Sequence, residues 1–314
     1  MAEKMATREA YGKALVELAG QYDFVVLDAD LAEATKTGMF KKAYPDRFFD
    51  CGIAEGNMMS VAAGIATTGK TVFASSFAMF AAGRAFEQVR NSIGYPHLNV
   101  KIGATHAGIT VGEDGATHQC NEDIGLMRTI PGMTIVNPSD AVEAKAAVEA
   151  ALTHDGPFYL RFGRFALPII NDRPGYRFEL GKGVELAGGK DLTIIATGLM
   201  VSVALEAKEL LAAEGIDARV VNIHTIKPID REIIAKAAKE TGAIVTAEEH
   251  NVIGGLGSAV AEVLCEECPA PLVRVGMKDT YGHSGTVPAL LEAYGLTAAD
   301  VVKAAKEALA KKRG

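Results

Sequence analysis

The segment TVFASSFAMFAAGRAFEQVRNSIGYPHLNVKIGA, residues 71–104, decides the fold. An apolar run at 71–76 is followed by a helical pattern at 80–94 and then by a second apolar run at 99–104. Strands that alternate with amphipathic helices are typical of a mostly parallel sheet covered by helices. The segment therefore predicts an α/β fold.

The alternation extends on both sides of this segment. Around it, the pattern predicts strands at 24–29, 134–138 and 158–162 and helices at 55–69 and 140–154. Ser139 and Asp140 are suited to cap the second of these helices. Further along, the pattern predicts strands at 191–198, 217–224, 243–249 and 271–277, helices at 201–215, 230–242 and 255–268, and two terminal helices.

The alternation is interrupted at residues 165–190, which contain two prolines and five glycines and show no helical period. Such a stretch indicates a connector, in which a short hairpin could form. We therefore expect two open, mostly parallel α/β domains. The first covers residues 1–165 and the second, smaller one covers 190–314, with a linker at 166–189.

Length, composition and charge exclude several classes of protein. With 314 residues, 49% of them hydrophobic and 23% charged, the chain is typical of a globular protein. Its formal charge of −7 gives no global attraction to nucleic acid or to anionic lipid. No apolar run approaches the ~20 residues that span a bilayer, and the first residues lack the apolar core of a signal peptide. We expect a cytoplasmic protein that binds neither nucleic acid nor membranes.

The four cysteines do not form a disulfide framework. Cys265 and Cys268 make one CxxC pair inside a predicted helix, while Cys51 and Cys120 lie far apart. One such pair supplies only two of the four ligands of a structural zinc site. We interpret the pair as packed, reduced thiols, with a redox pair and a metal site as alternatives.

Two segments that follow predicted strands carry acids and imidazoles. DCGIAEGN (50–57) places Glu55 at the start of a helix, either as a helix N-terminal acid or as an acid that meets a ligand. THAGITVGEDGATHQCNED (105–123) is a glycine-rich loop that contains His106, Asp114 and His118. These groups suit hydrogen bonding to a polyhydroxylated or phosphorylated ligand. The spacing matches neither HExxH nor a calcium loop, so we predict no metal site on this chain.

Aromatic and basic residues follow two other predicted strands. Phe77 and Phe80 lie one helical turn apart, which fits either the core or a face on which a planar ring stacks. Arg161 and Arg164 end the strand at 158–162, where a guanidinium either binds phosphate or lies on the surface.

Several nucleotide and hydrolase motifs are missing. The turn GGLGSA (254–259) lies between a strand and a helix, but it lacks the GxGxxG spacing and its acidic partner, so close packing explains its glycines better. His283, next to Ser284, could face a ligand, but we interpret it as an ordinary loop histidine. The chain has no GxxxxGK[ST], no GxSxG and no GDG followed by a metal-binding Asn.

Taken together, these segments resemble the carboxyl-terminal half of transketolase, as found when that enzyme is split between two chains. The resemblance is carried by motifs over nearly the whole chain: ATR (6–8), DADL (28–31), GIAEGNM (52–58), SSFAMF (75–80), THAGITVGEDGATHQ (105–119), RTIPGMTIVNPSD (128–140) and GRFALP (163–168). It implies a thiamine-diphosphate pyrimidine-binding domain followed by a transketolase C-terminal domain. The missing GDG…N segment, which holds Mg²⁺ and the diphosphate, would belong to a partner chain.

The resemblance also implies roles for single residues. Glu55 matches the glutamate that bonds N1′ of the cofactor's aminopyrimidine, and Phe80, with Phe77 beside it, matches the aromatic face against that ring. His118 matches a residue near the cofactor's amino group, and Asp30 one at the cofactor interface. For the substrate, Asp114 matches a residue that contacts a sugar hydroxyl, and His106 one that contacts the sugar or its phosphate. Arg8 and Arg164 match the arginines that bind the substrate phosphate. His106 and His118 also count with Glu55 as catalytic. The chain would be inactive alone and form an alpha2beta2 heterotetramer.

Two departures from the family pattern leave alternatives open. Ala34, followed by Thr35, stands where the family often has a phosphate-binding serine. GIAEG also resembles the GIAEQ of 1-deoxyxylulose-5-phosphate synthase rather than the REHG common in full-length transketolases. A subunit of that synthase type, a beta-type subunit of a 2-oxo acid dehydrogenase and a non-catalytic assembly subunit are therefore alternatives to a transketolase subunit.

Overall fold

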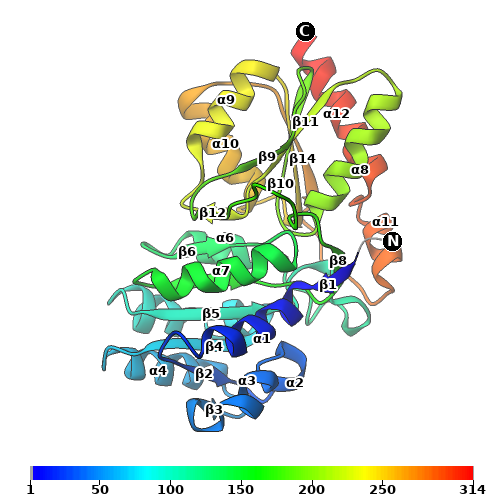
Figure 1. Cartoon of the computed structure of the whole chain (residues 1–314). Coiled ribbons are helices and arrows are strands. Elements are labelled where there is room, and N and C mark those ends of the chain that lie inside the picture. The colour runs from blue at the N-terminus through cyan, green and yellow to red at the C-terminus, as the bar shows by residue number, and fades with distance from the viewer. Residues whose placement is uncertain (1–2, 314) are drawn as a thin grey trace.

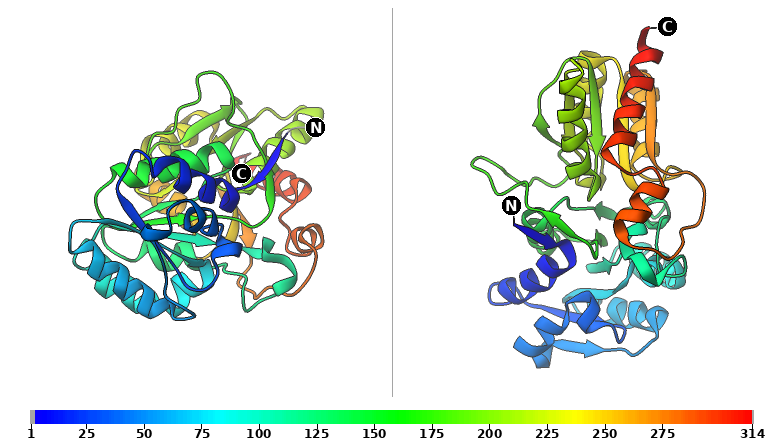
Figure 2. Two further views of the ribbon diagram at one scale, coloured as in Figure 1. Left: turned by 60° about the horizontal axis from the view of Figure 1, so that its bottom comes forward. Right: turned by 90° about the vertical axis from the view of Figure 1, so that its right-hand side faces the viewer.

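The structure is a computed structural model that describes residues 3–313. It consists of two α/β halves, each a sheet covered by helices, which lie one above the other in Figure 1. The N-terminal half of the chain builds most of the first sheet and the C-terminal half builds the second, as the colours of Figure 2 show. The expected class, two open and mostly parallel sheets, is confirmed. Within residues 3–313, no helix combines the length and the apolar composition needed to cross a membrane.

The first sheet has seven strands, which run parallel to their neighbours except at one edge. The order is β12 (Thr225–Lys227), β6 (Thr134–Val136), β7 (Phe158–Arg161), β5 (Val100–Thr105), β4 (Thr71–Phe77), β2 (Phe24–Asp28) and β3 (Phe48–Asp50). Only β12 is antiparallel to its neighbour. The carboxyl ends of the six parallel strands therefore meet at one edge, where open α/β sheets bind ligands.

Helices cover both faces of this sheet. One face carries α1 (Thr7–Leu18), α3 (Gly38–Ala43) and α7 (Ala141–Thr153), and the other carries α4 (Glu55–Ala66), α5 (Phe86–Gln88) and α6 (Asp123–Arg128). The first face packs through aromatic rings, and Tyr11 stacks on Phe162 with ring centroids 4.6 Å apart. The second is rich in alanine and methionine, whose small or unbranched side chains let helices approach the sheet closely.

The helix predicted at 80–94 is not regular. Two π-helical stretches, Met79–Arg84 and Val89–Gly94, flank α5. In the first, the backbone N–H of Ala85 donates to the carbonyl of Phe80, five residues earlier. A π-turn holds an additional residue compared with an α-turn, so it changes the direction of the side chains that follow, and such turns are frequent at functional sites.

The second sheet has five strands in the order β14 (Leu272–Met277), β13 (Ile244–Asn251), β10 (Leu192–Ala196), β11 (Ala218–Asn222) and β9 (Val184–Ala187). Only β9 is antiparallel to its neighbour. On one side lie α8 (Met200–Ala213), α11 (Val287–Ala293) and α12 (Ala298–Arg313), and on the other α9 (Arg231–Thr241) and α10 (Leu256–Glu267).

The connector does not form a hairpin of its own. Its first strand, β8 (Ala166–Pro168), pairs with β1 (Lys4–Ala6) in a separate antiparallel ribbon, and β9 pairs with β11. The reason is that β8 and β9 each pair with a strand edge elsewhere in the molecule. A hairpin between them would leave the edges of β1 and β11 unpaired.

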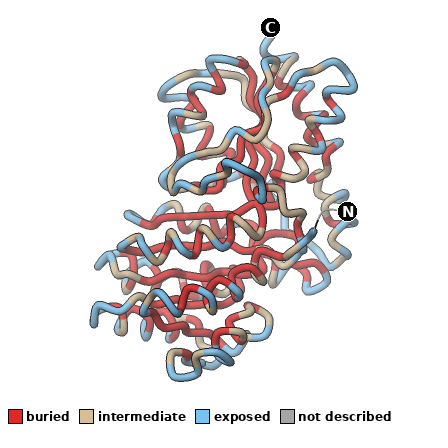
Figure 3. The backbone as a smooth tube through the Cα atoms, viewed as in Figure 1, coloured by how far each residue is buried: buried red, intermediate tan, exposed pale blue. Residues whose placement is uncertain are grey.

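The two halves share one buried core. β12 comes from the C-terminal half but completes the first sheet, and Lys227 donates through Nζ to the carbonyls of Arg128 and Ile130 at 2.8 and 2.7 Å. A single apolar cluster includes Ile135 of the first sheet and Ile195 of the second. Figure 3 shows the buried strands of both sheets meeting near the middle of the molecule. The halves are therefore packed together and not merely tethered.

All four cysteines are free thiols. Cys265 lies in α10 but is exposed, so the prediction that both members of the CxxC pair are packed is wrong for this residue. Cys268 lies just beyond the end of α10 and is half-buried.

Candidate active site

The sequence-predicted residues gather at the carboxyl edge of the first sheet. Phe77 ends β4, His106 follows β5, Arg164 follows β7 and Glu55 begins α4 beyond β3. Arg8 reaches the same edge from the first turn of α1. Parallel strands bring these residues together although they are up to 156 positions apart in the sequence.

Glu55 is a buried acid that is paired with an arginine. Its side chain is 2% exposed, and Nη1 of Arg84 lies 3.2 and 3.1 Å from its two carboxylate oxygens. As the first residue of α4, Glu55 also benefits from the positive end of the helix dipole. Arg84 comes from the first π-turn, and its guanidinium lies over the ring of Phe80, 4.6 Å from the centroid.

Two phenylalanines and two histidines form a continuous aromatic group. Phe77 stacks on Phe80 at 5.7 Å and on His106 at 3.7 Å between ring centroids. The His118 ring meets Phe80 edge-on at 5.4 Å. Phe77 is buried whereas Phe80 is half-exposed, with the Arg84 guanidinium over its ring. The pair therefore divides the two readings of the sequence: Phe77 packs in the core, and Phe80 lies where a planar group stacks on it.

His106 is held as a neutral imidazole in one tautomer. An arginine can only donate, so Nε2 of His106 accepts from Nη1 of Arg8 at 3.0 Å. Nδ1 then carries the proton and donates to Oγ1 of Thr105 at 3.0 Å. Burial, with the positive charges of Arg8 and Arg164, lowers the pKa of His106 to about 3. The residue also adopts a left-handed backbone with φ of 56°, which turns the chain out of β5 into the loop.

Arg164 lies beside the acids of the glycine-rich loop. Its Nη1 is 3.6 Å from Asp114 and 3.9 Å from Glu113, and it shares a surface cavity with Arg8. Arg161, the other candidate phosphate ligand, does not take part. It is fully buried and pairs with Asp123 at 2.9 Å, and it donates to the carbonyl of Glu249. Arg161 is therefore a structural residue, and the surface alternative is wrong as well.

Asp30 lies at the same edge but apart from this group. Its backbone N–H donates to Asp50 at 3.1 Å, and its side chain is exposed. Behind it, the buried carboxylate of Asp28 accepts hydrogen bonds from the hydroxyls of Thr35 and Thr37 at 2.7 and 2.8 Å. Burial raises the pKa of Asp28 to about 6, although these bonds act in the opposite direction. The Thr35 hydroxyl is thus already hydrogen-bonded to Asp28, so it does not replace the phosphate-binding serine that Ala34 lacks.

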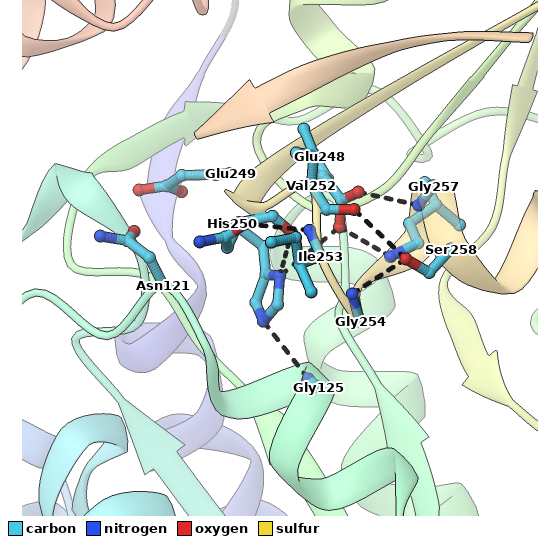
Figure 4. A network of polar contacts seen from close by, with 12 residues as sticks. Asn121, Gly125, Glu248, Glu249, His250, Val252, Ile253, Gly254, Gly257 and Ser258 are labelled. Atoms are coloured by element: carbon cyan, nitrogen blue, oxygen red, sulfur yellow. Dashed lines mark hydrogen bonds and ion pairs between the residues drawn. The ribbon is translucent and has the colours of Figure 1, made fainter. Parts of the chain in front are cut away.

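The glycine turn before α10 is filled by the chain's own acid. Glu248 accepts hydrogen bonds from the backbone N–H of Leu256 at 2.6 Å and of Gly257 at 2.8 Å (Figure 4). A Cβ at Gly255 would lie 2.0 Å from Oε2 of Glu248, so glycine is needed for this contact. Burial raises the pKa of Glu248 to about 7. The N-terminus of α10 is therefore closed to a nucleotide phosphate, and the packing interpretation is confirmed.

The C-terminal half touches the glycine-rich loop through a hydrogen bond. Nε2 of Gln119 donates to the carbonyl of His283 at 2.9 Å, while Nδ1 of His283 bonds to the hydroxyl of Tyr294 at 2.6 Å. His283 therefore supports the loop through its backbone.

Sequence reasoning missed Arg84, which contacts both Glu55 and Phe80. The only sequence feature that marks Arg84 is that it is a charged residue in an alanine-rich helical segment, two residues before Phe86. A regular helix does not predict where the Arg84 side chain points, because this stretch is π-helical. In residues 3–313, no three or more His, Cys, Asp or Glu side chains are placed so that they could hold a metal ion.

Family models now identify the two halves of the chain. The transketolase pyrimidine-binding domain matches residues 3–169, and the transketolase C-terminal domain matches residues 181–301. The chain belongs to the transketolase family.

Relatives within the transketolase family share this length and arrangement. A putative transketolase C-terminal section from Methanocaldococcus jannaschii is 50% identical, covering 97% of this chain and 96% of the relative. The 6-deoxy-6-sulfo-D-fructose transketolase subunit SqwH of a Clostridium species is 47% identical, covering 97% and 95%. A split-gene transketolase solved as an inactive beta4 tetramer is 58% identical with a TM-score of 0.92, covering 98% and 100%.

Enzymes of the transketolase family use thiamine diphosphate and a divalent metal, and the site can be tested for its fit to each. The guanidinium of Arg84 is a planar, donating group that stacks on Phe80 and bonds to Glu55. An aminopyrimidine with a protonated ring nitrogen needs the same two partners, so these residues fit that half of the cofactor.

Proposed function

We propose that this chain is the pyrimidine-binding subunit of a two-chain transketolase, which transfers a two-carbon ketol unit from a ketose phosphate to an aldose phosphate. The observation that carries the proposal is the joint placement of a buried acid, Glu55, and a half-exposed ring, Phe80, beside a cationic group that contains Arg8 and Arg164. Thiamine diphosphate supplies, when bound, the chemistry that breaks and forms the carbon–carbon bond.

On the cofactor side, each residue has a distinct task. Glu55 would hydrogen-bond the ring nitrogen N1′ and share a proton with it, while Phe80, with Phe77 stacked against it, would stack on the aminopyrimidine. His118, which meets Phe80 edge-on, would lie on the side of the cofactor's amino group. Asp30 would face the cofactor interface from the neighbouring loop.

On the substrate side, the neutral His106 and Asp114 hydrogen-bond sugar hydroxyls, and Arg8 and Arg164 bind the phosphate. The lowered pKa of His106 keeps it uncharged at neutral pH, so it can orient a hydroxyl without holding a competing positive charge. Asp114 now pairs with Arg164 and must exchange part of that contact for the substrate.

We further propose a partner subunit that carries the diphosphate-binding domain and Mg²⁺, in an alpha2beta2 heterotetramer. Support comes from relatives of the same length, one named a transketolase C-terminal section and one a transketolase subunit, and from the split-gene transketolase described as an inactive beta4 tetramer. In such an assembly the cofactor lies between chains, and this chain is inactive alone.

A coupled assay tests the proposal. This chain, the partner subunit, thiamine diphosphate and Mg²⁺ are mixed with xylulose 5-phosphate and ribose 5-phosphate, and sedoheptulose 7-phosphate is measured. Product should form only with both chains present. A second reaction contains pyruvate, and release of CO₂ from it without ketol transfer would favour the synthase or dehydrogenase alternatives. A complex that binds the cofactor but converts none of these substrates would favour an assembly role.

A further inference from the structure

The loop after β2 holds a cation to which the proposed function assigns no task. Lys36 follows α2 (Ala32–Thr35) and adopts a left-handed backbone with φ of 73°. A non-glycine residue in this region costs on the order of 1 kcal/mol and points to a constraint on the residue. Among residues 3–313, its ammonium group has no carboxylate within 4 Å and no hydrogen-bond acceptor, although the side chain is only half-exposed.

Helix α1 fixes the backbone of this loop at two points. Nη1 of Arg8 donates to the carbonyl of Ala34 at 2.8 Å. One helical turn later, Gly12 lies directly against Lys36, because a Cβ at Gly12 would be 2.5 Å from the Lys36 carbonyl and 2.7 Å from its Cβ. The loop segment 34–36 therefore runs along the first turns of α1, and Lys36 is held one helical turn from Arg8.

Below the loop, Asp28 fixes the same segment. Its carboxylate accepts the hydroxyls of Thr35 and Thr37, the residues on either side of Lys36. Thr35 and Thr37 are both bonded to Asp28, so Lys36 is the residue of 35–37 whose side chain has no hydrogen bond within the described part of the chain. The arrangement orders a long, flexible side chain at its base, which reduces the entropy lost when its tip binds a ligand.

Not every cationic side chain around Lys36 has an acidic partner. Arg164 has Asp114 and Glu113 as nearby acids, at 3.6 and 3.9 Å. Among the described residues, Arg8 and Lys36 have no carboxylate within 4 Å. Glu9 is close enough for its charge to act on both, but it pairs with Lys13 at 2.8 Å. Nε of Arg8 is buried without an acceptor. Lys36 is close enough to His106 for its charge to act on that ring together with the charges of Arg8 and Arg164. Cationic side chains without an acidic partner are suited to bind an anionic ligand.

We propose that Lys36 is a specificity-determining residue that binds the anionic terminal group of the sugar together with Arg8. This inference rests on the proposed function. Lys36 takes the place of the hydroxyl that Ala34 lacks, and it adds a full positive charge where a serine would add a neutral donor. The site therefore selects substrates by the negative charge of their terminal group, and a doubly charged phosphate gains more than a neutral hydroxymethyl end.

Kinetics of the assembled enzyme test this role. We expect Lys36→Met to raise KM for a ketose phosphate about tenfold, the loss expected for one charge-assisted contact, and to leave kcat within about twofold. The kcat/KM for the unphosphorylated ketose L-erythrulose should not change, and Lys36→Arg should restore most of the affinity. Lys42→Met, at an exposed lysine of α3, is the matched control. Equal losses for both ketoses, or no loss for either, would overturn the assignment.

A binding measurement separates this inference from the proposed function. The full chain alone is heated with increasing inorganic phosphate, and the melting temperature is recorded for the wild type, Lys36→Met and Lys42→Met. The wild type and Lys42→Met should be stabilised by phosphate, and Lys36→Met should lose most of that stabilisation. If the assembled complex lacks transketolase activity, the proposed function fails while this measurement still decides the role of Lys36. Equal stabilisation of all three proteins, or of none, would refute it.

Discussion

Arg84 donates to both carboxylate oxygens of Glu55 at 3.2 and 3.1 Å and covers the ring of Phe80 with the same guanidinium. In the proposed function, the cofactor's aminopyrimidine makes the same two contacts, with Glu55 and with Phe80. Arg84 must therefore leave at least one of them when the cofactor binds. Its side chain is 56% exposed, so it has room to move toward solvent.

Glu55→Gln should abolish transketolase activity of the assembled enzyme, by at least about a thousandfold, because an amide cannot share a proton with a ring nitrogen. The fold and the assembly should survive, since glutamine keeps the size of the side chain and one of its acceptor oxygens. Steady-state kinetics and size-exclusion chromatography check the two parts. Glu149→Gln, at an exposed position of α7, should behave as the wild type. Near-normal turnover by Glu55→Gln would contradict the role given to Glu55.

Arg84→Met should raise the affinity of the assembled enzyme for thiamine diphosphate about fivefold, since it removes a competing ion pair worth ~1 kcal/mol. Isothermal titration calorimetry with the cofactor measures the change. Arg90→Met, at an exposed arginine of the second π-helical stretch, is the control. A loss of affinity in Arg84→Met would instead show that the guanidinium is part of the cofactor site.

Asp140→Ala should destabilise the chain by about 2–4 kcal/mol, because two buried backbone N–H groups and a partly buried one lose their acceptor. The Asp140 carboxylate caps α7 by accepting from Glu143, and it accepts from Ile170 and Asn171 of the connector as well. Urea unfolding followed by circular dichroism measures the effect. Asp172→Ala, an exposed neighbour in the connector, should change stability by less than ~0.5 kcal/mol. Similar values for the two variants would rule out this anchoring role.

The buried acid Glu248 predicts a pH dependence of stability. Its pKa is raised by burial from 4.5 to about 7, so the folded state holds a proton that the unfolded state releases. Its stabilising contribution is fully present below about pH 4.5 and is lost as the pH rises through about 7, by on the order of 3 kcal/mol.

Glu248→Gln removes this titration. The free energy of unfolding of the wild type minus that of Glu248→Gln should therefore fall between pH 5 and pH 8, as measured by urea unfolding at each pH. Taking the difference cancels the contributions of other buried groups such as Asp28 and His106. A difference that stays constant or rises with pH would show that Glu248 is ionised throughout in the folded protein.

Local sequence patterns accounted for most of the fold, because strand and helix periodicity depends on neighbours a few residues apart. They did not predict the π-turns around α5, since such turns depend on what the helix packs against. They also did not predict that β12 would join the first sheet. Strand pairing between distant segments depends on which edges are free in three dimensions, and periodicity does not record this.

The two arginines at and beyond the end of β7 show what sequence patterns alone cannot predict. Arg161 and Arg164 are three residues apart and have the same chemistry, yet Arg161 is buried against Asp123 and Arg164 reaches the substrate edge. The sequence alone determined the α/β class and the motifs that reveal the transketolase family, because these depend on residue order. Only the tertiary structure decided which charged groups are paired, buried or free, because burial and pairing depend on residues that are distant in the chain and close in space.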